Sequence, residues 1–325
     1  IYDVIIIGAG PCGLACAIEA QKNKLNYLIL EKGSIAESIR RYPLEMTFFS
    51  TAENIEIGGL PLAVTGAKAT RAEALQYYRR VAEYYQLKVQ LHTNVLKVEK
   101  QEDIFQIQTS RRETYLTRNV VLATGYFDCP RMLNIPGEAS PHVFKYYDEP
   151  YRYIHSKVAI IGGGNSAVST ALDLYRHGVE VTMIVRKEDF KPTAKYWLVP
   201  DLKNRIKAGK IKARFNTQVT RIEHGRVWMK EKDQEEEQIL PADFVFMLIG
   251  YTPDVNLLRS IGVEVDPKHL APLFNPETFE SNIKGLYLAG TVVSGVRTEK
   301  VFIENGRYDG RKIVKNILES KKQMA

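Results

Sequence analysis

Two glycine-rich segments have the residue spacing of turns that hold the pyrophosphate of a dinucleotide. Residues 8–13 (GAGPCG) follow the apolar run 1–7, and residues 162–167 (GGGNSA) follow the run 157–161. Glycines at such strand-to-helix turns leave room for phosphate oxygens, which the backbone N–H groups at the helix N-terminus bind. The residues predicted to form the cradles are Gly8, Gly10, Pro11 and Gly13 in the first turn, and Gly162, Gly164, Asn165, Ser166 and Ala167 in the second.

The strands that follow the two turns end in different charges. The strand after the first turn ends at Glu31 and Lys32, whereas the strand after the second ends at Arg186 and Lys187. A carboxylate here accepts hydrogen bonds from two ribose hydroxyls, and a guanidinium binds a ribose 2′-phosphate. One such turn alone could serve only close packing, but two with opposite strand-end charges favour nucleotide binding. We therefore predict FAD at the first turn and NADPH at the second, with hydride transfer from NADPH to the flavin.

Cys12 stands one residue before the last glycine of the first turn, at the predicted start of a helix. Unpaired N–H groups and the helix macrodipole favour a thiolate there, and a thiolate beside a reduced flavin could attack a disulfide. A small apolar residue would also suit this turn, so packing is the alternative interpretation. We expect core packing for Cys16 and a structural role for Cys129. The histidines show no metal-ligand spacing, so we predict no metal site.

The composition limits the class of protein. The chain has 325 residues, of which 45% are hydrophobic and 26% charged, and no apolar run approaches the ~20 residues that span a bilayer. Three cysteines cannot form a disulfide framework, which favours a reducing compartment, so we predict a cytoplasmic protein. The net charge of +7 is scattered along the chain, so we expect attraction for anionic nucleotides but no nucleic-acid or membrane partner. We also expect a homo-oligomer.

The two halves of the chain repeat one another beyond the glycine turns. LKVQLHTNV (87–95) parallels IKARFNTQV (211–219), and VLATGY (121–126) parallels FMLIGY (246–251). Between these landmarks each half has short alternating strands, which predict an antiparallel meander. We therefore predict an α/β fold with two Rossmann-like dinucleotide-binding domains. The FAD-binding residues expected at strand ends of the first half are Val95, Ala123, Thr124 and Gly125.

The spacing of these landmarks places an insertion at 34–69 in the first half. It ends before a helix that starts at Thr70, where Thr70-x-x-Glu73 predicts a capping box. The insertion contains Phe49 and Ser50, which we expect beside the flavin ring. A loop that only packs on the core is the alternative.

The chain after residue 250 is too short for a third domain. It contains an apolar strand at 285–290 and a predicted helix at 298–318, and we expect it to rejoin the first half, with Gly290 and Thr291 at the FAD. The NADPH domain would then be inserted into a discontinuous FAD domain. The predicted boundaries are 1–126 and 251–325 for the FAD domain, 127–150 for a linker and 151–250 for the NADPH domain.

Five motifs together resemble the bacillithiol disulfide reductase family (YpdA type), within the thioredoxin-reductase-like flavoproteins that have two dinucleotide-binding domains. They are GAGPCGLA (8–15), MTFFSTAENIEIGG (46–59), GGGNSAV (162–168), KYWLVPDLKNRI (195–206) and VFIENGRYDG (301–310). The resemblance covers nearly the whole chain. It implies an FAD-containing, NADPH-dependent enzyme that reduces the disulfide of a low-molecular-weight thiol in bacteria, with Cys12 as the redox residue.

Two features depart from the wider superfamily. Thioredoxin reductases have a Cys-x-x-Cys pair in the NADPH domain, and this half of the sequence has no cysteine pair, which argues against thioredoxin as the direct substrate. The superfamily usually has an Asp after the final Ala-Gly that contacts the ribityl chain of the flavin, but here that residue is Thr291. Backbone N–H groups would then supply the contact.

Other functions remain open from the sequence. A ferredoxin or flavodoxin NADP reductase of the same architecture needs no cysteine pair and would use the basic surface to dock an acidic carrier. A non-enzymatic flavin redox sensor is a second alternative, and it predicts slow reduction of the flavin by NADPH. A flavin monooxygenase is disfavoured, because the stretch around His142 lacks the Phe-x-Gly that precedes a histidine in such enzymes.

Overall fold

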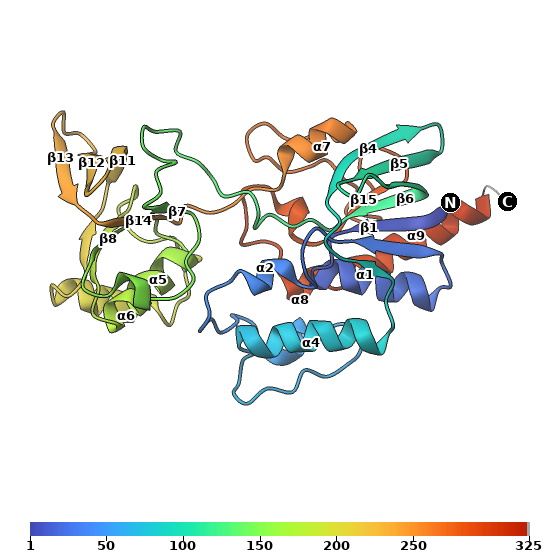
Figure 1. The fold of residues 1–325 in the computed structure, drawn as a ribbon, viewed down its shortest axis with the longest axis horizontal. Helices are drawn as coiled ribbons and strands as arrows, with labels where there is room; N and C mark the ends of the chain where they lie inside the picture. The colour runs from blue at the N-terminus through green and yellow to red at the C-terminus, as the bar shows by residue number, and fades with distance from the viewer. Residues whose placement is uncertain (324–325) are drawn as a thin grey trace. The chain divides into compact units, whose positions relative to one another are not determined.

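The computed structural model describes residues 1–323, which divide into two compact units (Figure 1). Unit 1 comprises Ile1–Arg41, Glu45–Cys129 and the chain from Tyr251 onward. Unit 2 comprises Tyr42–Leu44 and Pro130–Gly250. Each unit has its own sheet and hydrophobic core.

Unit 1 is built on a seven-stranded sheet. Its strands are β1 (Tyr2–Ile7), β2 (Tyr27–Leu30), β3 (Val89–Gln90), β4 (Val95–Gln101), β5 (Ile104–Thr109), β6 (Thr114–Leu122) and β15 (Leu286–Leu288). They run in the order β3-β2-β1-β6-β5-β4, with β15 also paired to β6. The pairs of β1 with β2 and β6, of β2 with β3 and of β15 with β6 are parallel, whereas β4, β5 and β6 form the predicted antiparallel meander.

Strand β6 belongs to both parts of this sheet. Its first half pairs antiparallel with β5, and its second half pairs in parallel with β1 and β15. The predicted meander strand at 114–117 and the strand that ends the first repeat are therefore one continuous strand. The counterpart in unit 2 is interrupted, because one strand ends at Pro241 and the next begins at Phe244.

Within residues 1–323, the helices of unit 1 come from all three of its chain segments. They are α1 (Pro11–Lys22), α2 (Glu37–Arg40), α3 (Ala52–Ile55), α4 (Arg71–Tyr84), α7 (Val255–Ile261), α8 (Ile303–Gly306) and α9 (Asp309–Gln323), with a 3-10 turn η2 (Gly290–Ser294). Helices α1 and α9 pack side by side, and α7 lies against β4 (Figure 1). Helix α1 begins at Pro11, whose missing N–H costs nothing there, and the capping box of α4 is confirmed in both directions between Thr70 and Glu73.

The single helix predicted over 298–318 is wrong. The chain forms two helices, α8 and α9, separated by Arg307 and Tyr308. The guanidinium of Arg307 donates to the carbonyl oxygens of Glu53 at 2.6 Å and Glu56 at 2.7 Å, which ties the break to the insertion. The break turns the start of α9, at Asp309, toward the first glycine turn.

Unit 2 contains a parallel sheet and a separate meander. The five-stranded parallel sheet has the order β10-β9-β8-β14-β7, built from β7 (Val143–Phe144), β8 (Lys157–Ile161), β9 (Glu180–Ile184), β10 (Lys212–Arg214) and β14 (Phe244–Met247). The antiparallel meander consists of β11 (Thr217–Glu223), β12 (Arg226–Glu231) and β13 (Glu237–Pro241). Strand β7 lies within the stretch 127–150 that the sequence predicted as linker.

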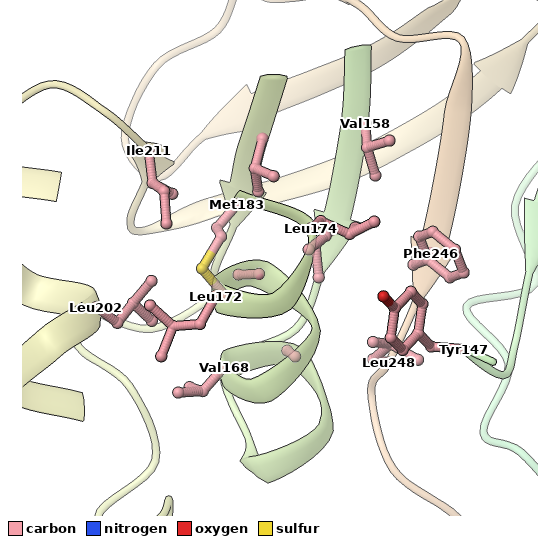
Figure 2. Packing of buried hydrophobic residues seen from close by; sticks show 14 of the residues in the cluster. Tyr147, Val158, Val168, Leu172, Leu174, Met183, Leu202, Ile211, Phe246 and Leu248 are labelled. Carbon is pink, nitrogen blue, oxygen red and sulfur yellow. The ribbon is translucent and has the colours of Figure 1, made fainter. Parts of the chain in front are cut away.

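Helix α5 (Asn165–Arg176) packs its apolar face on the parallel sheet of unit 2. Figure 2 shows Val168, Leu172 and Leu174 of this helix among the buried side chains of the sheet and of α6 (Val199–Lys207). A short 3-10 turn, η1 (Tyr151–Tyr153), precedes β8. Helix α5 ends at Arg176 with His177 as its C-cap, and Gly178 follows with φ of +79°, so the predicted glycine stop is confirmed.

None of the helices within residues 1–323 combines the length and the apolar character that crossing a bilayer requires.

Candidate active site

The first glycine turn connects β1 to α1, and its glycines have three different roles. Gly8 has φ of +110°, and a Cβ there would lie 2.6 Å from the carbonyl oxygen of Ala123. A Cβ on Gly13 would overlap the carbonyl oxygen of Gly8, whereas a Cβ on Gly10 would have no atom within 4 Å. The turn therefore needs Gly8 for its geometry and Gly13 for close packing, and it leaves open space at Gly10 where a pyrophosphate can approach.

Glu31 ties the end of β2 to this turn. Its side chain is buried, with 6% exposed, and its two carboxylate oxygens accept the N–H of Ala9 at 2.7 Å and that of Gly33 at 2.8 Å. Burial raises the pKa of Glu31, and these two N–H groups oppose the rise. Each oxygen keeps a second lone pair that a ribose hydroxyl can use. The N–H of Thr93 donates to the Glu31 carbonyl at 2.8 Å, which places Val95 two residues from this contact.

The ends of β6 and β15 complete the same edge of the sheet. The N–H of Ala123 donates to the carbonyl of Ile7 at 2.9 Å, and Thr124 follows it beside Gly8. The hydroxyl oxygen of Thr291 lies 3.2 Å from where a Cβ on Gly125 would be. The structure therefore brings the predicted residues at 123–125 and 290–291 to the first turn.

Cys12 lies at the start of α1 against two glycines from the C-terminal part of the chain. Its Sγ would be 2.7 Å from a Cβ on Gly290 and 2.9 Å from a Cβ on Gly306. Burial and the negative charge of Asp309 raise the pKa of the Cys12 thiol. The expectation that the helix N-terminus favours a thiolate is therefore wrong for this structure, since desolvation and a like charge outweigh the macrodipole.

Asp309 is the residue of this site that the sequence reasoning missed. Its side chain is 7% exposed, and its Oδ2 accepts the N–H of Gly290 at 2.8 Å. Burial raises the pKa of Asp309 to about 7, against the opposing effects of that N–H and of Lys312. The expected Asp after Ala289-Gly290 is absent, but a carboxylate from α9 reaches the same backbone. The glycine-rich motif GRYDG, which ends at Gly310, is the signal that could have found it.

The second glycine turn, between β8 and α5, is packed differently. A Cβ on Gly162 would overlap the carbonyl oxygen of Leu248, whereas a Cβ on Gly164 would meet only Cδ of Lys191, at 3.6 Å. Asn165 and Ser166 are exposed at the start of α5, and Ala167 is buried. The turn is therefore open to solvent at the residues that would hold a pyrophosphate.

A segment that we name the 190–195 loop lies over this turn. The N–H of Lys191 donates to the carbonyl of Gly163 at 2.9 Å, and the N–H of Lys195 donates to Oδ1 of Asn165 at 2.7 Å. Nδ2 of Asn165 donates to the carbonyl of Thr193 at 3.3 Å. The Asn165 side chain thus joins the start of α5 to the loop.

Arg186 and Lys187 are both exposed and follow the end of β9. The neighbouring strand holds this end in place, since the N–H of Val185 donates to the carbonyl of Arg214 at 2.8 Å. The N–H of Asn216 donates to the carbonyl of Lys187 at 3.0 Å. Two cations on an ordered strand end can bind the 2′-phosphate of a nucleotide.

Comparison with known proteins identifies the family. A family model described as pyridine nucleotide-disulphide oxidoreductase matches residues 5–290. The chain is 40% identical over 314 residues to the bacilliredoxin reductase Bdr of Bacillus subtilis (strain 168), with 96% of each protein covered. Solved structures of the bacillithiol disulfide reductase Bdr (YpdA) cover 98% of this chain and 99% of their own, from Staphylococcus aureus (38% identity, TM-score 0.94) and Bacillus cereus (36%, 0.96). This chain belongs to the bacillithiol disulfide reductase family.

Membership of the bacillithiol disulfide reductase family makes the protein an oxidoreductase, a flavin disulfide reductase with FAD and NADPH as cofactors. The geometry fits both groups. The open space at Gly10 and the buried carboxylate of Glu31 suit an unphosphorylated adenosine ribose and pyrophosphate, and the exposed turn with Arg186 beyond it suits a phosphorylated one. In residues 1–323, no group of three or more His, Cys, Asp or Glu side chains is arranged to hold a metal ion.

The insertion is held to α4 by hydrogen bonds from tyrosines. The hydroxyl of Tyr77 accepts the N–H of Ile57 at 2.8 Å, and the hydroxyl of Tyr78 donates to the carbonyl of Ile55 at the same distance. On its other side, α3 packs against α8, the helix that ends at Gly306. In this reductase the insertion is therefore fixed beside the helix that contacts Cys12.

Phe49 and Ser50 precede α3 within this insertion. Phe49 is 45% exposed, and Nζ of Lys68 lies 5.4 Å from its ring centroid. Its ring is thus available to a ligand, and its contact with the flavin stays a prediction. Lys32 does not point into the turn, because its ammonium pairs with Asp128 at 2.8 Å. Arg41 also pairs with that carboxylate.

The three cysteines are free. Cys16 is buried between α1 and α9, which confirms core packing, and Cys129 is partly buried outside the turn. Cys12 is therefore the cysteine that lies in the first glycine turn.

Proposed function

We propose that this protein reduces bacillithiol disulfide, with NADPH as the electron donor and Cys12 as the single protein thiol in the exchange. The relatives of known structure are named for this substrate, and they match the chain over nearly its whole length. The proposal also includes the predicted cytoplasmic location and a preference for NADPH over NADH through Arg186 and Lys187. The predicted homo-oligomer and the domain boundaries remain predictions.

One observation supports the single-cysteine chemistry most directly. Cys12 is in the glycine turn that fits FAD, and its sulfur packs against two glycines, Gly290 and Gly306. Cys16 is buried one helical turn further on, and both sulfurs are free. A bond between these two sulfurs would distort α1, so Cys12 can form a mixed disulfide with the substrate but does not close an internal one.

The two glycine turns would bind different cofactors. Gly10 and Glu31 would hold the diphosphate and ribose of FAD, while Asn165, Ser166 and Arg186 would hold NADPH. The bound flavin supplies the two-electron chemistry between nucleotide and sulfur. Cys12 would attack the substrate disulfide, which releases one thiol and leaves the other attached to the protein.

The substrate is tested by following NADPH oxidation with the purified, FAD-loaded protein. Bacillithiol disulfide, glutathione disulfide, thioredoxin and ferredoxin should be compared in parallel. We expect turnover with bacillithiol disulfide to exceed that with each of the others by at least about tenfold. Faster turnover with ferredoxin would instead support the ferredoxin-reductase alternative.

The role of Cys12 is tested with Cys12→Ser and the matched control Cys129→Ser. We expect Cys12→Ser to abolish disulfide reduction while stopped-flow reduction of the flavin by NADPH continues at the wild-type rate. The control should retain both reactions, because Cys129 lies outside the turn. Disulfide reduction that survives Cys12→Ser would refute the single-cysteine proposal. Slow flavin reduction in the wild type would favour the redox sensor.

A further inference from the structure

Cys12 and Asp309 are far apart in the sequence but face the same glycine. A Cβ on Gly306 would lie 2.9 Å from Sγ of Cys12 and 3.6 Å from Oδ2 of Asp309. The same Oδ2 accepts a hydrogen bond from the N–H of Gly290. A Cβ on Gly290 would lie 2.7 Å from Sγ of Cys12. The sulfur and the carboxylate therefore border the same two glycines, close enough for one water molecule to carry a proton between them.

Close packing of α1 on α9 fixes this arrangement. A Cβ on Gly310 would lie 2.7 Å from Cα of Cys16, so the two helices touch at their backbones. Asp309 is the first residue of α9, and the hydrogen bond to Gly290 holds its carboxylate toward the turn. The carboxylate cannot swing away from Cys12 without breaking this contact.

The other titratable groups around this pair are few. Lys312, on α9, is the cation that acts on Asp309, and Cys16 is the neighbouring thiol on α1. The partner from η2 is a backbone N–H, and α8 presents Gly306. Burial raises the pKa of Asp309 to about 7, and the charge on Asp309 adds to the effect of burial in raising the pKa of Cys12. Ionisation of either group therefore hinders ionisation of the other.

We propose that Asp309 is the proton acceptor for Cys12 during disulfide exchange, an inference that rests on the role of Cys12 in the proposed function. The Cys12 thiol passes its proton to the carboxylate and becomes a thiolate. The thiolate forms a bond to one sulfur of the substrate, the substrate S–S bond breaks, and the second sulfur leaves as a thiolate. That thiolate takes the proton from Asp309 and departs as a thiol, which restores the carboxylate. The electrons that later reduce the mixed disulfide come from NADPH through the flavin.

The test uses the FAD-loaded enzyme, with Asp309→Asn and the matched control Glu304→Gln on α8. Alkylation of Cys12 by iodoacetamide is measured by peptide mass spectrometry, and disulfide turnover is measured beside it. In Asp309→Asn we expect alkylation at about pH 8, one unit above the pKa of Asp309, to become about tenfold faster, because the neighbouring charge is gone. We expect turnover to become at least about tenfold slower, because the proton acceptor is gone. The control should change neither rate.

A purely structural role for Asp309 would lower both rates together. An unchanged alkylation rate in Asp309→Asn would show that the charge of Asp309 does not affect the ionisation of Cys12. An unchanged turnover rate would show that Asp309 does not carry the proton. Either result overturns the proposal. The turnover of Cys12→Ser tests the proposed function separately. The alkylation of Cys12 tests the influence of Asp309 even if the enzyme does not turn over.

The wild-type enzyme gives a second measurement if Asp309→Asn does not retain FAD. Two groups that share one proton give a thiolate population that rises in two steps with pH. We therefore expect the alkylation rate of Cys12 to rise, level off above about pH 7, where Asp309 titrates, and rise again at higher pH. A single ionisation across the whole range would overturn the proposal.

Discussion

The two glycine turns share a backbone course but differ in how closely the helix approaches. In the first turn a Cβ on Gly13 would overlap the carbonyl oxygen of Gly8. In the second turn the equivalent residue is Ala167, and its Cβ fits there, 3.4 Å from where a Cβ on Gly162 would lie. The third glycine is therefore required where α1 touches its own turn and is dispensable at α5. A glycine fingerprint read from sequence combines two requirements, ligand approach and helix packing, that the structure separates.

The turns also differ in where their charges lie. The first has buried carboxylates, Glu31 and Asp309, that are tied to backbone N–H groups, whereas the second has exposed cations, Arg186 and Lys187. Burial sets the protonation of the first pair, while the second pair presents cationic side chains to solvent and attracts anions. The first turn suits a ligand that stays bound, and the second suits a ligand that exchanges.

The difference in helix approach predicts the largest effect. Gly13→Ala should lower the free energy of unfolding by at least about 3 kcal/mol and reduce the FAD content, because the new Cβ meets backbone that cannot move aside. The matched change in the second turn, Ala167→Gly, should cost only about 1 kcal/mol through lost helix propensity. Guanidinium unfolding and flavin absorbance measure both. Equal destabilisation by the two variants would refute the packing difference.

The exposed cations predict the next largest effect. Arg186→Glu should shift the ratio of kcat/KM for NADPH over NADH by about 100-fold toward NADH, because a charged contact with the 2′-phosphate becomes a repulsion. Lys207→Glu, an exposed residue of α6 in the same unit, is the control for the change in net charge. A ratio that stays constant in Arg186→Glu, or one that shifts equally in Lys207→Glu, would remove Arg186 from the phosphate site.

The comparison also shows what the sequence could predict. Both turns, the start of α1, the glycine stop of α5 and the capping box at Thr70 depend on neighbours within a few residues, and the structure confirms them. The contact of Asp309 with Gly290 depends on the packing of α9 on α1 and on the break at Arg307. The motif GRYDG could mark Asp309 as a candidate, but no local pattern encodes its contact with Gly290. The expected Cys12 thiolate was wrong for the same reason, because helix position is local but burial is not.

The buried carboxylate of the first turn predicts a smaller effect on the flavin. Glu31→Gln should weaken FAD binding by about tenfold, because the amide replaces one acceptor with a donor that faces an N–H of Ala9 or Gly33. Fluorescence titration of the FAD-free protein with FAD measures this. Glu102→Gln, in an exposed turn between β4 and β5, is the control. Equal affinities for wild type and Glu31→Gln would contradict the assignment of FAD to this turn.

Glu31 also predicts a pH dependence. Because burial raises its pKa, the native state binds this proton at a higher pH than the unfolded chain does. Its contribution to stability is therefore present below the ordinary carboxyl pKa of 4.5 and is lost as the pH rises through the raised value. The free energy of unfolding of wild type should fall across that window relative to Glu31→Gln. If the free energies of unfolding of wild type and Glu31→Gln changed in parallel with pH, the pKa of Glu31 would not be raised in the native state.

The 190–195 loop predicts the smallest effect, confined to the second turn. Asn165→Ala removes the side-chain bonds to Lys195 and Thr193, so the loop should be held over the turn less of the time. These bonds are exposed, and losing them should raise the KM for NADPH by only about threefold, with FAD content and kcat unchanged. Asn204→Ala, on the exposed side of α6, is the control. Within residues 1–323, the side-chain hydrogen bonds of Asn165 go to Thr193 and Lys195 and do not reach the first turn. A loss of FAD in Asn165→Ala would therefore mean that the two turns are not independent.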